Sequence, residues 1–227
     1  MQESNPIARK QPLLMIPLKD ENPTQRFPFI TLLFILLNIA VFFYGTSLPF
    51  PPSALYADYA LVPIELLSRP LEVYPTIYTS MFLHADIWHL GGNMLYLWIF
   101  GNNIEDVLGK LRFVLFYFLC GTLAAFGHIT TELDSKIPMV GASGAISGIL
   151  GAYLILFPFA KIRTFIFLGF FWTIARIPAI VLLLFWIVLQ IWNSAFTAAS
   201  ATAWFAHIGG FIVGVLLILP FKNFSKL

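Results

Sequence analysis

The sequence predicts an all-α polytopic membrane protein, a bundle of six transmembrane helices whose fourth helix is short and partly submerged. Three observations favour this fold class. Of the 227 residues, 59% are hydrophobic and only 11% are charged, whereas a soluble domain carries about a quarter charged residues. Uncharged apolar runs recur along the chain, and a helix needs roughly 17–25 such residues to cross a bilayer. Most lysines and arginines fall in alternate connections between these runs.

The predicted spans are the uncharged runs, taken in chain order. Residues 1–26 are polar and charged, do not resemble a cleavable signal peptide, and are predicted to be a cytoplasmic segment. Residues 27–221 form the membrane domain, and residues 222–227 form a cytoplasmic tail. The uncharged stretch 177–221 is too long for one crossing, and its small, polar middle predicts a turn. The spans cover residues 27–44, 84–103, 113–129, 143–157, 177–194 and 204–220.

Two further apolar stretches are predicted to lie at the membrane interface. The stretch 50–67 is interrupted by proline, aspartate and glutamate, which indicates an interfacial loop. The run 164–175 is only about a dozen residues long, which favours an interfacial or re-entrant piece over a span.

The basic residues predict the orientation of the bundle. If the N-terminus is cytoplasmic and the spans alternate, eleven of the 13 lysines and arginines lie inside, and only Arg69 and Lys136 lie outside. The positive-inside rule favours this arrangement, with both termini in the cytoplasm. Together with the absence of a signal peptide, it predicts a plasma or inner cell membrane.

Several polar side chains fall near the outer ends of the predicted spans. His84, His89 and Asn93 lie early in the second span, Ser143 opens the fourth, and His207 lies early in the sixth. Hydrocarbon solvates polar groups poorly, so such residues carry a presumption of function. The three spans run in the same direction, and the sequence therefore brings a serine, histidines and an amide to one depth, toward the outer face.

The fourth span is short for a bilayer. From Ser143 to Phe157 it covers about 15 residues, or roughly 22 Å of helix, against a hydrocarbon core of about 30 Å. Pro158 discourages continuation of the helix. If the inner end reaches the interface, the outer end lies below the surface, and the loop 132–142 dips into the membrane. Water can then follow the loop, as hydrolysis requires.

The segment GASGAISG places Ser143 at a helix N-terminus between small residues, including Gly141 and Gly144. Free backbone amides and the positive end of the helix dipole would stabilise the oxyanion that forms when a serine attacks a carbonyl. The alternative is a small-residue packing face, which is common between membrane helices.

The segment AHIGGFIVG places His207, Gly210 and Gly214 on one helix face. The glycines permit close approach to the small residues of the fourth span. Such an approach would bring His207 near Ser143, and serine is a weak nucleophile without a base. The alternative is a structural histidine that is hydrogen-bonded within the bundle.

The segment HADIWHLGGN places His89 and Asn93 on one face of the second span, where both side chains can donate hydrogen bonds to an oxyanion. His84 is offset and is predicted to brace the outer loop. Metal ligation is the rival interpretation, but no HExxH motif is present. A single cysteine and a formal charge of +2 argue against cysteine metal clusters and nucleic-acid binding.

The acidic residues favour a catalytic dyad over a triad. Asp86 is the only acid near these histidines, and it stands at the mouth of the second span. No acidic residue occurs from Lys136 to the C-terminus.

In combination, the motifs resemble the rhomboid family of intramembrane serine proteases. The resemblance rests on HLGGN, on GASG around Ser143, on AHIGG with Gly210 and Gly214, and on EDVLG, residues 105–109. It extends from about Ile16 to the C-terminus, with the motifs in the family's order and six predicted spans.

The resemblance implies a rhomboid-like bundle in which Ser143 and His207 form a catalytic dyad and an acyl-enzyme intermediate. It implies an oxyanion hole made by His89, Asn93 and the Ser143 backbone amide. Its substrates would be membrane-anchored proteins in the lipid bilayer, cut near the outer face, with no cofactor or metal. Supporting positions are His84, Gly141, Gly144, Gly210 and Gly214.

Two positions depart from the family pattern. Many members carry a Trp-Arg pair in the first outer loop, where this chain has Pro75-Thr76. Many also have an aromatic residue four positions after the nucleophile, against which the histidine packs, and this chain has Ser147.

Two other functions are compatible with a polar cavity in a membrane. The first alternative is a catalytically inactive rhomboid-like protein that binds membrane clients without cutting them. Such relatives generally lack the serine or the histidine, and this chain has both. The second alternative is a transporter, but the sequence shows no internal repeat. The oligomeric state is not predicted.

Overall fold

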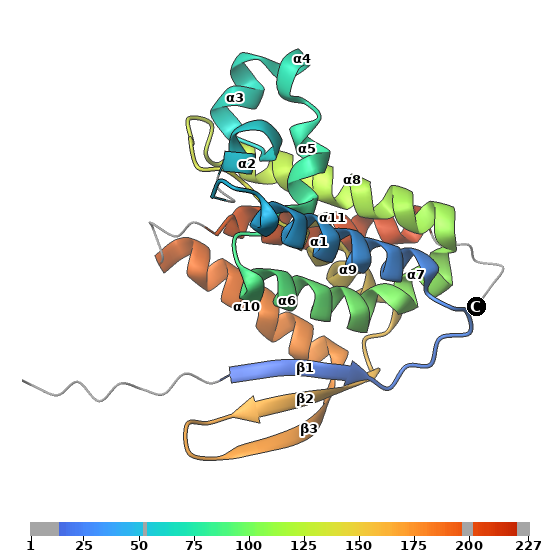
Figure 1. Ribbon diagram of the computed structural model, residues 1–227. Coiled ribbons are helices and arrows are strands. Elements are labelled where there is room, and N and C mark those ends of the chain that lie inside the picture. Colours follow the sequence, from blue (N-terminus) through green and yellow to red (C-terminus); the bar gives the residue numbers. More distant parts are fainter. Residues whose placement is uncertain (1–13, 52–53, 197–201, 222–227) are drawn as a thin grey trace, which may run out of the picture.

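The computed structural model of the chain describes residues 14–51, 54–196 and 202–221. Most of this part is helical, and a small sheet lies beside the helices (Figure 1). The helices are α1 (Phe29–Ser47), α2 (Ala54–Tyr59), α3 (Pro63–Ser68), α4 (Pro70–Val73), α5 (Thr76–Thr79), η1 (Ser80–Phe82), α6 (Ile87–Tyr96), η2 (Leu97–Gly101), α7 (Asn102–Leu108), α8 (Lys110–Ile129), α9 (Ser143–Leu156), α10 (Ala179–Phe196) and α11 (Trp204–Phe221). The strands are β1 (Leu14–Asp20), β2 (Lys161–Phe167) and β3 (Trp172–Pro178).

Four helices, α1, α8, α10 and α11, are long and apolar enough to cross a bilayer. They contain 18 to 20 residues, and at 1.5 Å per residue they match a hydrocarbon core of about 30 Å. Large apolar side chains point outward from them, including Leu36, Val188 and Leu216. Such surfaces need lipid as their solvent. The chain is therefore a membrane protein, and the predicted polytopic helical class is confirmed.

The second predicted span, 84–103, corresponds to the consecutive segments α6, η2 and α7. The helix begins after Asp86, because the Asp86 carboxylate accepts hydrogen bonds from two backbone amides of the first turn. It ends at Gly109, whose φ of +76° favours glycine. The helical segment therefore starts and ends later along the chain than the predicted span, whose crossing of the bilayer stays a prediction. The predicted tail 222–227, and parts of the predicted N-terminal segment and turn, lie outside the described residues.

Helix α9 is enclosed by the rest of the bundle (Figure 1). It packs against α8, α10, α11 and the α6–α7 segment, and every residue from Ala145 to Tyr153 is buried. A helix that is apolar on all sides belongs in such a position. With 14 residues, it is about 21 Å long. The predicted fourth span is thus a short helix, and its depth in the bilayer stays a prediction.

The stretch 50–67, predicted to be an interfacial loop, is largely helical. With the residues that follow, it forms the short helices α2 to α5 and η1, which lie together at one end of the bundle (Figure 1). We call residues 54–82 the cap. A β-bridge between Leu61 and Met139 ties the cap to the loop before α9, and the Gly141 amide donates to the Ser80 carbonyl over 2.9 Å. The cap therefore fixes the chain just before Ser143.

The structure also contains an element that an all-α prediction omits, an antiparallel sheet in the order β1-β2-β3. Strands β2 and β3 form a hairpin over the stretch 164–175, which was predicted to be an interfacial or re-entrant piece. The hairpin turns at Gly169, which has a φ of +84°. Its β-branched and aromatic residues favour strands, but the periodicity of so short an apolar run does not separate a strand from a buried helix.

The sheet is tied to the bundle through Asp20, the last residue of β1. The buried Asp20 carboxylate accepts hydrogen bonds from Asn103 Nδ2 of α7 over 2.6 Å and from the Tyr153 hydroxyl of α9 over 3.1 Å. Asn103 in turn accepts from the Asn22 amide at 2.8 Å. The sheet is thereby joined to the end of α9 opposite Ser143.

A second buried carboxylate joins α7 to α1. Glu105 accepts hydrogen bonds from the backbone amides of Ile30 and Thr31, and also from the Thr31 hydroxyl, over 2.8 to 2.9 Å. Helix α1 has no side-chain cap of its own at Pro28. Glu105 satisfies amides that would otherwise lack partners at the first turn of α1.

Helices α9 and α11 touch through their backbones. A Cβ atom built on Gly214 would collide with the Gly148 carbonyl, and one on Gly210 would collide with the Gly144 carbonyl. Each glycine therefore occupies a position where any side chain would push the two helices apart.

We predict that Gly214→Ala destabilises the protein by about 1–3 kcal/mol, because the added methyl group meets backbone that has no rotamer to yield. The measurement is the thermal unfolding midpoint in mild detergent. Gly91→Ala in α6 is the matched control, since no atom lies within 4 Å of its added Cβ. Equal midpoints for the two variants would contradict the backbone contact.

We predict that the contributions of two neighbouring acids, Asp20 and Glu21, to the stability of the fold depend on pH in opposite directions. Burial raises the pKa of Asp20 above its ordinary value, so its contribution to stability is present below the unfolded pKa and is lost as the pH rises through the folded pKa. The hydrogen bond from Arg163 lowers the pKa of Glu21, so its contribution is lost as the pH falls.

The measurement is the unfolding midpoint between acidic and neutral pH. Relative to Asp20→Asn, the wild type should lose stability as the pH rises, and relative to Glu21→Gln it should lose stability as the pH falls. Parallel curves for wild type and Asp20→Asn would show that the Asp20 carboxyl does not titrate differently on folding.

Candidate active site

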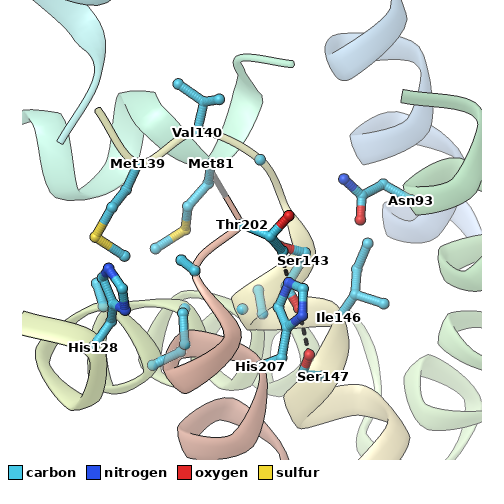
Figure 2. A pocket seen from close by; sticks show the side chains of 18 of the residues that line it. Met81, Asn93, His128, Met139, Val140, Ser143, Ile146, Ser147, Thr202 and His207 are labelled. Atoms are coloured by element: carbon cyan, nitrogen blue, oxygen red, sulfur yellow. Dashed lines mark hydrogen bonds between the residues drawn. The ribbon is translucent and has the colours of Figure 1, made fainter. Parts of the chain in front are cut away.

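The central contact of the site joins Ser143, the first residue of α9, to His207, in the first turn of α11. The Ser143 Oγ and His207 Nε2 atoms are 2.9 Å apart, although the residues are 64 positions apart in sequence. Figure 2 shows the imidazole ring beside the serine, with Asn93 reaching in from α6. The sequence predicted this pair, and the structure brings it within hydrogen-bonding distance.

The glycine contacts explain why this distance is short. Gly144 follows Ser143 directly, and Gly210 lies one turn after His207. The close backbone contact between Gly144 and Gly210 is therefore adjacent to the reacting atoms. Because no side chain separates the helices there, the Ser143 hydroxyl and the His207 imidazole lie close to each other.

The backbone at Ser143 combines a helix start without a side-chain cap and a glycine turn. Helix α9 begins without a side-chain cap, and the first amides of a helix have no intrahelical acceptor. Gly141, with a φ of +118°, makes the turn that leads into the helix. A Cβ on Gly141 would lie 2.8 Å from the His89 ring. This glycine therefore leaves room for His89 beside the serine.

His89 and Asn93 both line the cavity that contains Ser143. The Asn93 Nδ2 group is buried and has no hydrogen-bond partner among the described residues. The Ala85 amide lies 3.5 Å from His89 Nδ1, and this contact assigns the proton of the neutral ring to Nε2. Two N–H donors thus line the same cavity as Ser143, an arrangement that suits a developing oxyanion.

His84 lies behind His89 and does not line the cavity. Its ring is buried and meets the His89 ring edge to face, with centroids 5.0 Å apart. The bracing role predicted for His84 stays a prediction. Among the described residues, no group of three or more His, Cys, Asp or Glu side chains is placed to hold a metal ion.

The cavity has a volume of about 410 Å³ and extends past Ser143 to a second wall. Met81, His128 and Met139 form this wall (Figure 2). His128 lies near the end of α8 and is buried. One water occupies about 30 Å³ in the liquid, so the cavity has room for a peptide segment and water.

Three residues that contact His207 were missed by the sequence analysis. Trp186 and Trp204 flank its ring, with centroids 6.1 and 5.9 Å from it, and Gln190 lies beside the ring nitrogen that faces away from Ser143. Ser147, where many family members have an aromatic residue, instead donates its hydroxyl to the Ser143 carbonyl over 2.6 Å. The two tryptophans supply the aromatic packing from other positions.

The fold and the site define a polytopic membrane protein with a serine–histidine pair at an internal cavity. A family model described as the Rhomboid domain matches residues 71–224, more than half of the chain. The chain belongs to the rhomboid family, and the resemblance found in its motifs is confirmed.

Several curated relatives support this membership. The chain is 36% identical over 149 residues to Rhomboid protein 1, mitochondrial, of Saccharomyces cerevisiae, covering 62% of this chain and 40% of that protein. It is 35% identical over 130 residues to the Putative rhomboid protease YdcA of Bacillus subtilis, covering 57% and 63%. It is 43% identical over 76 residues to Rhomboid protease GluP of the same organism, covering 34% and 14%. The chain thus spans less than two thirds of the length of these relatives.

We predict that Gly141→Ala slows the reaction of Ser143 with a fluorophosphonate probe about tenfold or more, because the methyl group displaces His89 and strains the turn. The measurement is the second-order labelling rate, with the thermal midpoint as a folding check. Gly209→Ala, whose added Cβ meets no atom closer than 3.8 Å, should label normally. Equal rates for both variants would show that the position of His89 is irrelevant to the serine.

Proposed function

We propose that this protein is an intramembrane serine endopeptidase that hydrolyses peptide bonds in or near the transmembrane segments of other proteins. One observation carries the proposal, the 2.9 Å contact between Ser143 Oγ and His207 Nε2 inside a membrane bundle. A serine needs a base at this distance to become nucleophilic. The protease-named relatives support the proposal, and each of those names describes that relative.

The proposed reaction uses the dyad twice. His207 accepts the Ser143 hydroxyl proton while Oγ bonds to the substrate carbonyl carbon, and the carbonyl oxygen becomes an oxyanion. His89 Nε2–H, Asn93 Nδ2 and the Ser143 amide donate hydrogen bonds to that oxyanion. The peptide C–N bond then breaks, and His207 donates its proton to the leaving amine. Water, deprotonated by His207, attacks the acyl-enzyme, and the proton returns to Ser143 as the product acid leaves.

We propose membrane-anchored proteins as the substrates. A peptide carbonyl within a regular helix is already hydrogen-bonded and enclosed by side chains, so a substrate helix has to unwind before Oγ can approach it. The cavity beside α9 offers polar partners for such an unwound segment within an otherwise apolar bundle.

The membrane and the orientation are part of the proposal. We infer that both termini face the compartment that holds most lysines and arginines, with Ser143 toward the opposite face. The sequence favours a plasma or inner cell membrane, and the yeast relative that is named as mitochondrial adds a mitochondrial membrane as a second location for a chain of this family.

We predict that the purified wild type, in mild detergent, labels with a fluorophosphonate probe and cuts a model transmembrane substrate. Ser143→Ala should lose both activities, and His207→Ala should lose cleavage, since the serine then has no base. Ser194→Ala in α10 is the matched control, because its hydroxyl donates to the Ile191 carbonyl away from the dyad.

The opposite outcome would favour the alternative function. If the wild type neither labels nor cuts, and membrane proteins still co-purify with it, the chain is a client-binding member of the family without protease activity.

A further inference from the structure

The ring nitrogen of His207 that faces away from Ser143 has a partner of its own. His207 Nδ1 lies 2.9 Å from Gln190 Oε1, a side-chain oxygen of helix α10. Gln190 is buried, with 7% of its surface exposed. The mechanism described above for Ser143 and His207 assigns no role to Gln190. A buried polar group in a membrane bundle is costly unless it is hydrogen-bonded, so this contact needs an explanation.

The other end of the Gln190 side chain fixes which way its amide points. Gln190 Nε2 lies 3.3 Å from the Trp186 carbonyl, and a carbonyl oxygen only accepts hydrogen bonds. The NH₂ group therefore faces Trp186 and the oxygen faces His207. An oxygen acceptor at 2.9 Å requires the hydrogen to be on His207 Nδ1.

This assignment determines the chemistry at the opposite ring nitrogen. A neutral imidazole carries one hydrogen, so a ring protonated at Nδ1 presents a lone pair at Nε2. That lone pair faces the Ser143 hydroxyl, the direction that general-base catalysis needs. The other tautomer would present an N–H to Ser143 and could not accept its proton.

We propose that Gln190 is a positioning residue that holds His207 in the tautomer competent to deprotonate Ser143. The effect of Gln190 on catalysis rests on the proposed protease function, whereas its hydrogen bond to His207 does not depend on that function. Gln190 acts through His207 and does not touch the reacting atoms. The site is then a serine, a histidine and a neutral amide, from α9, α11 and α10.

The environment explains why an amide is suited to this position. In soluble serine proteases a buried carboxylate orients the histidine, but an isolated carboxylate in a membrane interior is far more costly than an amide. No acidic residue follows Asp134 in the sequence. Gln190 supplies the acceptor that sets the tautomer without introducing a charge.

Packing alone does not account for the contact. The rings of Trp186 and Trp204 restrain the plane of the imidazole, but contacts between aromatic rings do not distinguish a hydrogen on Nδ1 from one on Nε2. A carbonyl oxygen at Nδ1 makes that distinction, because it only accepts, whereas the Ser143 hydroxyl at Nε2 can donate or accept.

The test uses the full-length protein in detergent and three variants. Gln190→Leu removes the acceptor, Gln190→Glu restores an oxygen at the same distance along the side chain, and Val188→Ala alters the exposed face of the same helix as the control. The first readout is the nitrogen-15 NMR spectrum of protein labelled at its four histidines, with the His207 signals identified by their loss in His207→Ala.

At a pH where the ring is neutral, wild type and Val188→Ala should show His207 protonated at Nδ1 alone, and Gln190→Leu should show a mixture of tautomers. An unchanged Nδ1–H tautomer in Gln190→Leu would overturn the proposal. This readout needs no substrate, so it decides the role of Gln190 even if the wild type proves not to be a protease.

The second readout separates kcat from KM on the model substrate. Gln190→Leu should lower kcat about ten- to a hundredfold, a part of what a general base contributes, with KM unchanged, and Gln190→Glu should recover most of the loss. Unfolding midpoints check that the variants are folded. A change in KM alone, or equal losses in the Leu and Glu variants, would indicate a structural role and overturn the proposal.

Discussion

The backbone contact between α9 and α11 is the constraint on which the site depends. Gly144 and Gly148 offer carbonyls to the space that Gly210 and Gly214 leave free, so the distance between the two helices is set by main-chain atoms. Side chains change rotamers, whereas main-chain atoms in a helix do not. The distance between Ser143 and His207, which lie in the first turns of these helices, is consequently fixed as well. The cap and the sheet then hold the two ends of α9 in place.

The site also shows how polar chemistry can be arranged where charge is expensive. The side chains assigned to the reaction with Ser143 are the imidazoles of His207 and His89 and the amide of Asn93, none of which is an acid. Among the described residues the buried carboxylates are Asp20 and Glu105, which lie at the opposite end and are each held by several hydrogen bonds. Two of these contacts, Ser143 with His207 and His207 with Gln190, pair neutral groups, which lowers the cost of burying them.

The sequence predicted the helical membrane class and the convergence of Ser143 with His207, because alternate spans have to present equivalent ends to one leaflet. It did not predict the sheet, since a run of a dozen apolar residues has the same composition in a hairpin and in a short helix. It also missed Gln190. A single amide in an apolar helix is visible in sequence, but its partner depends on the rotation of that helix, which the sequence does not specify. The roles assigned to His89 and Asn93 remain predictions.

The hydrogen bonds from α1 to Glu105 have a consequence for the order of assembly. The acceptor for the first turn of α1 is encoded 75 residues after the amide that it satisfies. Helix α1 is synthesised before α7, so until Glu105 is in place the first amides of α1 need other acceptors, such as water or lipid headgroups. When α7 arrives, Glu105 replaces them. The exchange couples α1 to a helix made later, and α1 is locked into the bundle only when α7 is in place.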